Sequence, residues 1–460
     1  MDGQPDQPLV RGRLVSKPAQ NELLYGAASA DDPYLPASGN GGYRVSRYDL
    51  ELIYRMSSNR LSGRAKLSAV ATQELTRLSL DLAGLKVSKV SVNGRRAAKF
   101  AATDRKLHIW PDRTLPVGTS LNIDIQYAGN PAPLSGPWGD VGWEELDDGV
   151  IVAGQPNGAA SWFPCNDHPS NKASYRISVT TDSPYQVISN GTLLSKTVRS
   201  SQTTWVYDQP EPMASYLATV QIGQYRSLDL GSEPVQSYAA IPAGSSAEFA
   251  EDFGRQSDMI AAFSTMFGPY PFGSYTVVVT ADDLEIPLEA QGMSVFGANY
   301  LDGERSEERL VAHELAHQWF GNSLTVQRWQ HIWLHEGFAC YAEWLWSEVS
   351  GGPSADKLAR RSWDKLAAEP QDLVIAAPGA RLMFDDRLYK RGALTLHALR
   401  RTLGDEDFFQ MLREWTQAHR HGNVSTEEFM AHAGRFRERS LAGLFNAWLF
   451  EQELPELPNR

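Results

Sequence analysis

Apolar and polar residues alternate with a period of two along the first half of the chain, from residue 43 to about residue 226. Typical runs are YRVSRYDLELIYRM and SLNIDIQYAG, and they are separated by Asn-Gly, Pro and Gly. Such alternation places every second side chain on one face of a strand, and the interruptions are typical of turns. The pattern predicts an all-β domain of antiparallel sheet, of the sandwich type, over residues 43–228.

The period lengthens after residue 228. The segment AEFAEDFGRQSDMIAAFSTMFG has the periodicity of one amphipathic helix, and SYTVVVTADD predicts a buried strand. Beyond Arg305 helical patterns predominate, several of them preceded by Ser or Asp at the N-cap position. We therefore expect a mainly helical domain over residues 229–460. Residues 1–42 are rich in Gln, Pro, Asp, Gly and Ser, and they predict an N-terminal tail or surface extension.

The composition is that of a folded globular protein, and it excludes several classes of function. Of 460 residues, 42% are hydrophobic and 21% are charged, and 55 Asp and Glu against 43 Lys and Arg give a net charge of −12. An acidic chain without a basic patch is not expected to bind nucleic acid or an anionic membrane surface. Two cysteines, Cys165 and Cys340, are too few for a disulfide framework or a cysteine-ligated zinc site.

Signals for membrane insertion or export are not evident in the sequence. The N-terminal segment MDGQPDQPLVRGRLVSKPAQ has no apolar core of a signal peptide, and no later run reaches the roughly 18 apolar residues of a membrane span. We therefore expect a cytoplasmic protein with no membrane partner. A leader removed before residue 1 would leave the same sequence.

The segment His313-Glu314-Leu315-Ala316-His317 has the spacing HExxH inside a run of helical periodicity. Four residues turn a helix by about 400°, so both imidazoles lie on one face, one turn apart, as a single zinc ion requires. The alternative is that these are two ordinary core or surface histidines. The chain has 10 histidines, so two of them can have this spacing by chance. The spacing by itself indicates two metal ligands but does not exclude two ordinary histidines.

A third ligand is available at Glu336, on the next predicted helix after His317. Two imidazole nitrogens and one carboxylate oxygen leave the fourth tetrahedral position to water, which is typical of a catalytic zinc site. The combined spacing predicts one Zn²⁺ per chain. Glu314 lies about 100° around the helix from His313, where it can act as a general base. Glu343, seven residues beyond Glu336, either accepts a ring N–H from a ligand or is a solvated glutamate.

Several motifs together carry a resemblance to a known family. HELAHQWFGN followed by WLHEGFA is similar to the zinc-binding core of the M1 metallo-aminopeptidases, the gluzincin family of aminopeptidase N and leukotriene hydrolase. Residues 388–394 resemble the tyrosine-bearing helix start of that family, and residues 155–169 resemble its loop ending in Phe-Pro-Cys-x-Asp-x-Pro. The resemblance covers residues 43–460. It implies a sandwich or saddle-shaped β domain followed by a thermolysin-like, mainly helical zinc catalytic domain.

The resemblance also implies a role for each residue of the motifs. His313, His317 and Glu336 are the expected metal ligands, and Glu314 is the expected general base. Tyr389 is the hydroxyl expected to stabilise the oxyanion, as any preorganised donor would. By spacing alone Tyr389 would be interpreted as a core or interface tyrosine.

The chain departs from the family where the substrate amine is bound. The usual Gly-x-Met-Glu-Asn signature is represented by residues 286–293, in which Glu289 takes the place of the amine-binding glutamate while the Gly, Met and Asn around it are missing. Gln155 stands where the family has a second amine-contacting residue. We expect Glu289 and Gln155 to bind the substrate amine.

A second departure is length, because many members continue into a helical domain over the active site and this chain ends at Arg460. We expect either an open cleft that admits longer peptides or self-association that covers it. The leading interpretation is a zinc aminopeptidase acting on peptides with a free N-terminus. The alternatives are a zinc epoxide hydrolase or endopeptidase on the same scaffold, and a non-catalytic peptide-binding module. Metal content and turnover of amino-acid anilides would discriminate between them.

Overall fold

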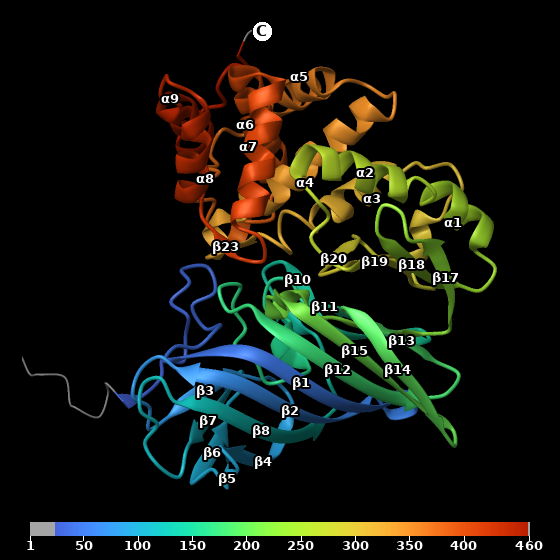
Figure 1. Ribbon diagram of the computed structural model, residues 1–460, viewed down its shortest axis with the longest axis vertical. Helices are drawn as coiled ribbons and strands as arrows, with labels where there is room; N and C mark the ends of the chain where they lie inside the picture. The colour runs from blue at the N-terminus through green and yellow to red at the C-terminus, as the bar shows by residue number, and fades with distance from the viewer. Residues whose placement is uncertain (1–23, 459–460) are drawn as a thin grey trace, which may run out of the picture.

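A computed structural model describes residues 24–458. The chain has a β-rich N-terminal half and a mainly helical C-terminal half, which lie one above the other in Figure 1. The predicted fold class, a β domain followed by a helical catalytic domain, is thereby confirmed.

The largest sheet of the N-terminal half has eight strands in the order β14-β15-β12-β1-β2-β8-β4-β5. Its long strands alternate between buried and exposed residues, as the sequence pattern predicts. One pairing differs from the antiparallel prediction, because β1 and β12 run parallel. The strands are β1 (Tyr43–Arg55), β2 (Arg60–Ala71), β4 (Lys86–Val92), β5 (Arg95–Arg96), β8 (Ser120–Gly129), β12 (Ala173–Asp182), β14 (Thr192–Arg199) and β15 (Gln202–Met213).

Two smaller sheets, in the orders β13-β16-β11-β10-β9 and β3-β7-β6, complete this half. Aromatic side chains fill the core against the large sheet: Tyr54 packs on Trp143 with ring centroids 4.9 Å apart, and Tyr48 packs on Phe163 at 5.6 Å. The strands are β3 (Leu78–Asp81), β6 (Lys99–Ala102), β7 (Lys106–Trp110), β9 (Leu134–Gly136), β10 (Gly139–Leu146), β11 (Gly149–Ala153), β13 (Gln186–Ser189) and β16 (Val220–Gly223).

The catalytic half begins with a mixed sheet in the order β17-β18-β19-β21-β20, whose central strands are parallel. Its strands are β17 (Tyr225–Gly231), β18 (Gln236–Pro242), β19 (Ser274–Val279), β20 (Leu288–Ala290) and β21 (Met293–Phe296). The predicted domain boundary at residue 228 falls within β17. The single helix expected before β19 is two helices, α1 (Ser246–Asp252) and α2 (Gln256–Phe267), because the chain turns at Gly254.

Helices α3 to α9 form the rest of the catalytic half, and α4 packs against both α3 and α6. Where α4 and α6 cross, a Cβ on Gly337 would lie 2.9 Å from the backbone of Gly392, so only glycine permits this approach. The elements are α3 (Glu308–Ala316), α4 (Trp333–Val349), α5 (Ala355–Leu366), α6 (Asp386–Leu403), α7 (Asp405–Ala418), α8 (Thr426–Ala433), α9 (Ala442–Phe445), and the short parallel pair β22 (Thr325–Val326) and β23 (Asn423–Val424). Among the helices of residues 24–458, none has the length and apolar character needed to cross a membrane.

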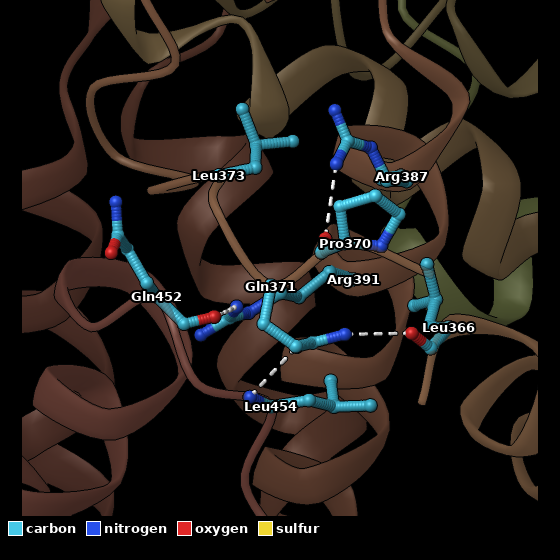
Figure 2. A pocket seen from close by; sticks show the side chains of 8 residues that line it. All are labelled: Leu366, Pro370, Gln371, Leu373, Arg387, Arg391, Gln452 and Leu454. Carbon is cyan, nitrogen blue, oxygen red and sulfur yellow. Dashed lines mark hydrogen bonds between the residues drawn. The ribbon is translucent and has the colours of Figure 1, made fainter. Parts of the chain in front are cut away.

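The guanidinium of Arg391 fixes the C-terminal segment to α6. Arg391 is buried and donates to five backbone carbonyls between residues 447 and 453. Figure 2 shows Arg391 reaching Gln452, while Gln371 joins Leu366 to Leu454. These hydrogen bonds fix the helix that carries Tyr389 against the end of the described chain.

Part of the predicted tail is well packed. Residues 1–23 lie outside the described part, but Asp32 is only 1% exposed. Its Oδ2 accepts from the backbone N–H of Trp329, at 3.0 Å, and lies 3.2 Å from Nε2 of His168. The segment around Asp32 therefore joins the β-rich half to the loop before α4, which the polar composition of residues 1–42 did not predict.

Candidate active site

Helix α3 positions His313 and His317 on one face. His317 is the C-cap residue and keeps right-handed helical backbone angles, so the four-residue spacing holds up to the second imidazole. The two ring centroids lie 4.8 Å apart. Both side chains are buried, as is Glu314 between them.

Glu336, in the first turn of α4, faces both imidazoles. Its Oε2 lies 3.6 Å from Nε2 of His313 and 3.4 Å from Nε2 of His317. One ligand atom from each of the three residues falls within 4.8 Å of the others. The structure therefore brings together the three side chains that the sequence proposes as metal ligands.

The other ring nitrogen of each histidine has its own partner. Nδ1 of His313 lies 2.8 Å from Oε1 of Glu343, and Nδ1 of His317 lies 3.0 Å from the carbonyl oxygen of Phe320. Acceptors at both Nδ1 atoms hold a ring proton there, so the Nε2 atom of each ring is the one that faces Glu336. Of the two sequence interpretations of Glu343, the geometry favours a contact with a ligand.

The electrostatics of the cluster favour a bound cation. Burial alone would lower the pKa of His313, but hydrogen bonds with Glu336 and Glu343 outweigh it and raise the pKa to about 9. Burial also lowers the pKa of His317, yet the charges of Glu336 and Glu289 raise it to about 10. Protons at the Nε2 atoms offset the surrounding carboxylates, and a divalent ion would replace these protons while those at Nδ1 stay.

The donor set fits zinc. Ligands about 2.0–2.2 Å from a tetrahedral ion lie about 3.4 Å apart, close to the measured separations of Glu336 from the two imidazoles. Two neutral nitrogens and one carboxylate, with ring protons fixed on the outer side, are the ligands that zinc prefers in catalytic sites. The residues present can therefore hold one zinc ion and leave a position for water.

Two further predicted residues line the same cleft. Glu314 is buried beside the ligands, and burial raises the pKa of its carboxyl above the ordinary value. Tyr389, in the first turn of α6, stacks its ring on His313 at a centroid distance of 6.1 Å and an interplanar angle of 16°. Burial, followed by the charge of Glu336, raises the pKa of Tyr389, so its hydroxyl stays protonated and can donate.

Glu289 and Gln155 meet although they come from different halves of the chain. Nε2 of Gln155, in the loop after β11, donates to Oε1 of Glu289 in β20 at 2.6 Å. The strand β20 is fixed by Asn322 and Gln318, whose side-chain amides donate to the carbonyl of Ala290. The altered sequence around Glu289 is therefore still anchored to the loop that follows α3.

These side chains enclose a cleft of about 190 Å³. Sequence reasoning did not single out Arg309, Leu310, Asp386 or Lys390, which also line it. Arg309 precedes His313 by four residues, so helical spacing could have placed it on the ligand face. The lining residues are Gln155, Ile286, Pro287, Glu289, Arg309, Leu310, His313, Glu314, His317, Glu336, Glu343, Asp386, Tyr389 and Lys390.

Both halves of the chain match domains of a known protein family. Residues 45–217 match the peptidase M1 N-terminal domain, and residues 252–448 match the peptidase family M1 domain. The M1 zinc metallopeptidase of Deinococcus radiodurans is similar in structure, with a TM-score of 0.85, 30% sequence identity, and coverage of 94% of this chain and 99% of that one. A variant of that metallopeptidase has been solved with a Tyr-Ser-Ala substrate.

Two curated relatives match over smaller shares of their length. Aminopeptidase M1-D of Oryza sativa subsp. japonica is 28% identical over 320 residues, which are 64% of this chain and 36% of that protein. Endoplasmic reticulum aminopeptidase 1 of Homo sapiens is 26% identical over 419 residues, which are 83% of this chain and 44% of that protein. The chain thus spans less than half the length of these two relatives. Because both halves match the family domains and a structure of the same extent is 30% identical, the chain belongs to peptidase family M1.

Proposed function

We propose that this protein is a zinc-dependent aminopeptidase that binds one Zn²⁺ per chain and hydrolyses the first peptide bond of peptides with a free N-terminus. One observation carries the proposal. A three-ligand metal cluster and an oriented carboxylate–amide pair, Glu289 with Gln155, line the same cleft. The first supports hydrolysis, and the second supports recognition of an ammonium group.

Substrate binding is assigned to the Gln155 side of the cleft. Glu289 accepts hydrogen bonds from the substrate ammonium group, and the amide of Gln155 fixes the orientation of its carboxylate. One carboxylate oxygen of Glu289 lies within 4.8 Å of a ring nitrogen of His317 and an oxygen of Glu314. An amine at Glu289 therefore places the first carbonyl of the peptide beside the ligand cluster, and cleavage follows residue one.

The chemical step is assigned to Glu314 and Tyr389. When bound, zinc polarises the scissile carbonyl and lowers the pKa of a water molecule toward about 7. Glu314 takes the proton of the attacking water and delivers it to the leaving amine. The hydroxyl of Tyr389 donates to the oxygen on which negative charge develops. His313, His317 and Glu336 keep the metal in place throughout.

The test uses amino-acid p-nitroanilides with the purified chain. We expect hydrolysis of the free-amine anilides, its loss with a zinc chelator and its recovery when zinc is added. The N-acetylated anilides serve as matched controls and should not be cleaved, because they carry no ammonium group. Equal cleavage of acetylated and free substrates would remove the exopeptidase assignment and indicate an endopeptidase. Full activity after metal removal would remove the zinc assignment.

A further inference from the structure

The active-site cleft is lined by cations as well as carboxylates. Glu289 and Glu314 line it on the amine-binding side of the ligand cluster, whereas Arg309 and Lys390 line it together with Glu343. Neither cation is used by the hydrolytic mechanism proposed above. Arg309 pairs with Glu343, which contacts the ligand His313, whereas Glu289 and Glu314 approach the ligand His317.

Arg309 is the cation best placed to contact a substrate. It lies in the first turn of α3, one turn before His313 and on the same face. Its side chain is 54% exposed, with Nη1 3.7 Å from Oε2 of Glu343 and Nη2 3.3 Å from Oε2 of Glu307. The other oxygen of Glu343 contacts the ligand His313 at 2.8 Å, so one carboxylate separates the guanidinium from the metal cluster.

The guanidinium of Arg309 retains free donor capacity. Within residues 24–458 it takes part in these two ion pairs but makes no hydrogen bond to the protein. Its position does not contribute to helix stability, because a cation in the first turn is disfavoured by the helix dipole. A planar group with five N–H donors is the side chain best suited to bind a carboxylate through two hydrogen bonds.

Lys390 adds positive charge to the same wall. It follows Tyr389 on α6, and its Nζ lies 3.4 Å from Sγ of Cys340 and 3.7 Å from Oδ1 of Asp386. Its side chain is largely buried, so it contributes to the local potential rather than extending into solvent. Arg309 and Lys390 are the cations of a wall that also carries the carboxylates of Glu343 and Asp386.

The chain length of the substrate determines which anionic group reaches Arg309. An extended peptide advances about 3.3–3.6 Å per residue, so the C-terminal carboxylate of a dipeptide or tripeptide lies within one or two residues of the scissile carbonyl. An acidic side chain at the second residue lies at a similar distance. Both sources place a carboxylate shortly after the scissile bond.

We propose that Arg309 is a specificity-determining residue that binds this carboxylate, so that the favoured substrates are dipeptides and tripeptides with a free C-terminus and peptides with an acidic second residue. The inference rests on the proposed aminopeptidase function and names its substrate class. The substrate spans the cleft with its ammonium group at Glu289 and its carboxylate at Arg309.

The test compares kcat/KM for Ala-Ala with that for Ala-Ala-amide, and for Ala-Asp-amide with that for Ala-Asn-amide. A charge-assisted hydrogen bond corresponds to about a 10- to 100-fold preference, and we expect the wild-type enzyme to favour each carboxylate by this factor. The first pair reports the C-terminal source of the carboxylate, and the second pair reports the side-chain source. A preference in either pair that depends on Arg309 supports the proposal.

Substitution of Arg309 separates this role from a structural one. We expect Arg309→Gln to reduce the preference ratios to about one and Arg309→Lys to retain part of them, since charge without the planar fork binds more weakly. Arg361→Gln, which removes an exposed arginine of α5 outside the cleft lining, is the matched control and should keep the wild-type ratios. Wild-type ratios near one, or ratios unaltered in Arg309→Gln, would overturn the proposal. Failure of the aminopeptidase assignment itself would appear differently, as absence of anilide hydrolysis by the wild-type enzyme.

Discussion

Gln155 and Glu289 are joined by a hydrogen bond of 2.6 Å, although 134 positions separate them in the chain. Gln155 follows β11 of the β-rich half, and Glu289 belongs to β20 of the catalytic sheet. The two halves thus contribute one residue each to the lining of the same cleft. This contact joins the β-rich half to the candidate site, and we propose that the amide of Gln155 orients the carboxylate of Glu289.

Glu289→Gln should weaken recognition of the substrate amine. The change removes the negative charge but keeps the shape, so we expect kcat/KM for amino-acid anilides to fall about 10- to 100-fold, the range of a charge-assisted hydrogen bond. Glu285→Gln, at an exposed position in the segment before β20, is the matched control. Steady-state kinetics check the prediction, and an equal loss in both variants would contradict it.

Glu314→Gln should abolish most turnover while leaving the metal in place. A positioned general base contributes about 100- to 10,000-fold to the rate, and an amide cannot accept the proton. Glu314 lines the cleft but is assigned no bond to the metal, so zinc content should remain that of the wild-type protein. The measurement pairs kcat with elemental analysis. A zinc-loaded variant turning over at the wild-type rate would remove Glu314 from the mechanism.

Glu343→Gln should weaken zinc binding rather than catalysis by the bound ion. The carboxylate of Glu343 contacts Nδ1 of His313 at 2.8 Å, and loss of such an outer contact costs about 10- to 100-fold in metal affinity. Competition with a chelator of known affinity measures the dissociation constant directly. Glu348→Gln, on the same helix but bonded to Arg400 at the surface, should bind zinc like the wild type. Unchanged affinity in Glu343→Gln would show that this contact does not orient the ligand.

Asp167→Asn should alter the pH dependence of stability. Burial, and then the charge of Asp81, raises the pKa of the Asp167 carboxyl from 3.8 to about 7. Between these values the folded protein retains a proton that the unfolded chain releases, so the contribution of Asp167 to stability is complete below about pH 4 and is lost as the pH rises through about 7. The asparagine side chain stays neutral and can still pair with Ser215 and the backbone N–H of Ala160, the present partners of Asp167.

The variant should therefore gain in melting temperature relative to the wild type as the pH increases from 4.5 to 8. The corresponding free energy is on the order of 1–4 kcal/mol, at 1.36 kcal/mol per pKa unit. Thermal unfolding of both proteins across this interval measures the difference. A constant difference between them at every pH would contradict the assignment of a proton to Asp167.

The sequence predicted elements whose cause is local. The HExxH spacing placed His313 and His317 on one helical face because a helix repeats every 3.6 residues, and α3 has that geometry. Strand alternation likewise predicted which residues of β1 are buried. The fold class and the family resemblance are confirmed, whereas the roles assigned to the site residues stay predictions until they are tested.

Features that depend on distant partners were not predictable in this way. Alternation predicts which side chains of a strand face the core, but it does not predict which strand lies beside it. The parallel pairing of β1 with β12 therefore did not follow from the pattern. The helical periodicity of the sequence continues across Gly254 and predicted one helix, whereas the structure has a turn there between α1 and α2. The packing of Asp32 against Trp329 joins residues 297 positions apart, and no local pattern reports such a contact.

X-ray diffraction collected on both sides of the zinc absorption edge tests the central claim, that His313, His317 and Glu336 bind one zinc ion. We predict a single anomalous peak per chain, about 2.0–2.2 Å from Nε2 of each histidine and from a carboxylate oxygen of Glu336. A zinc-supplemented crystal with no peak among these three side chains, or with its zinc bound elsewhere, would contradict the account.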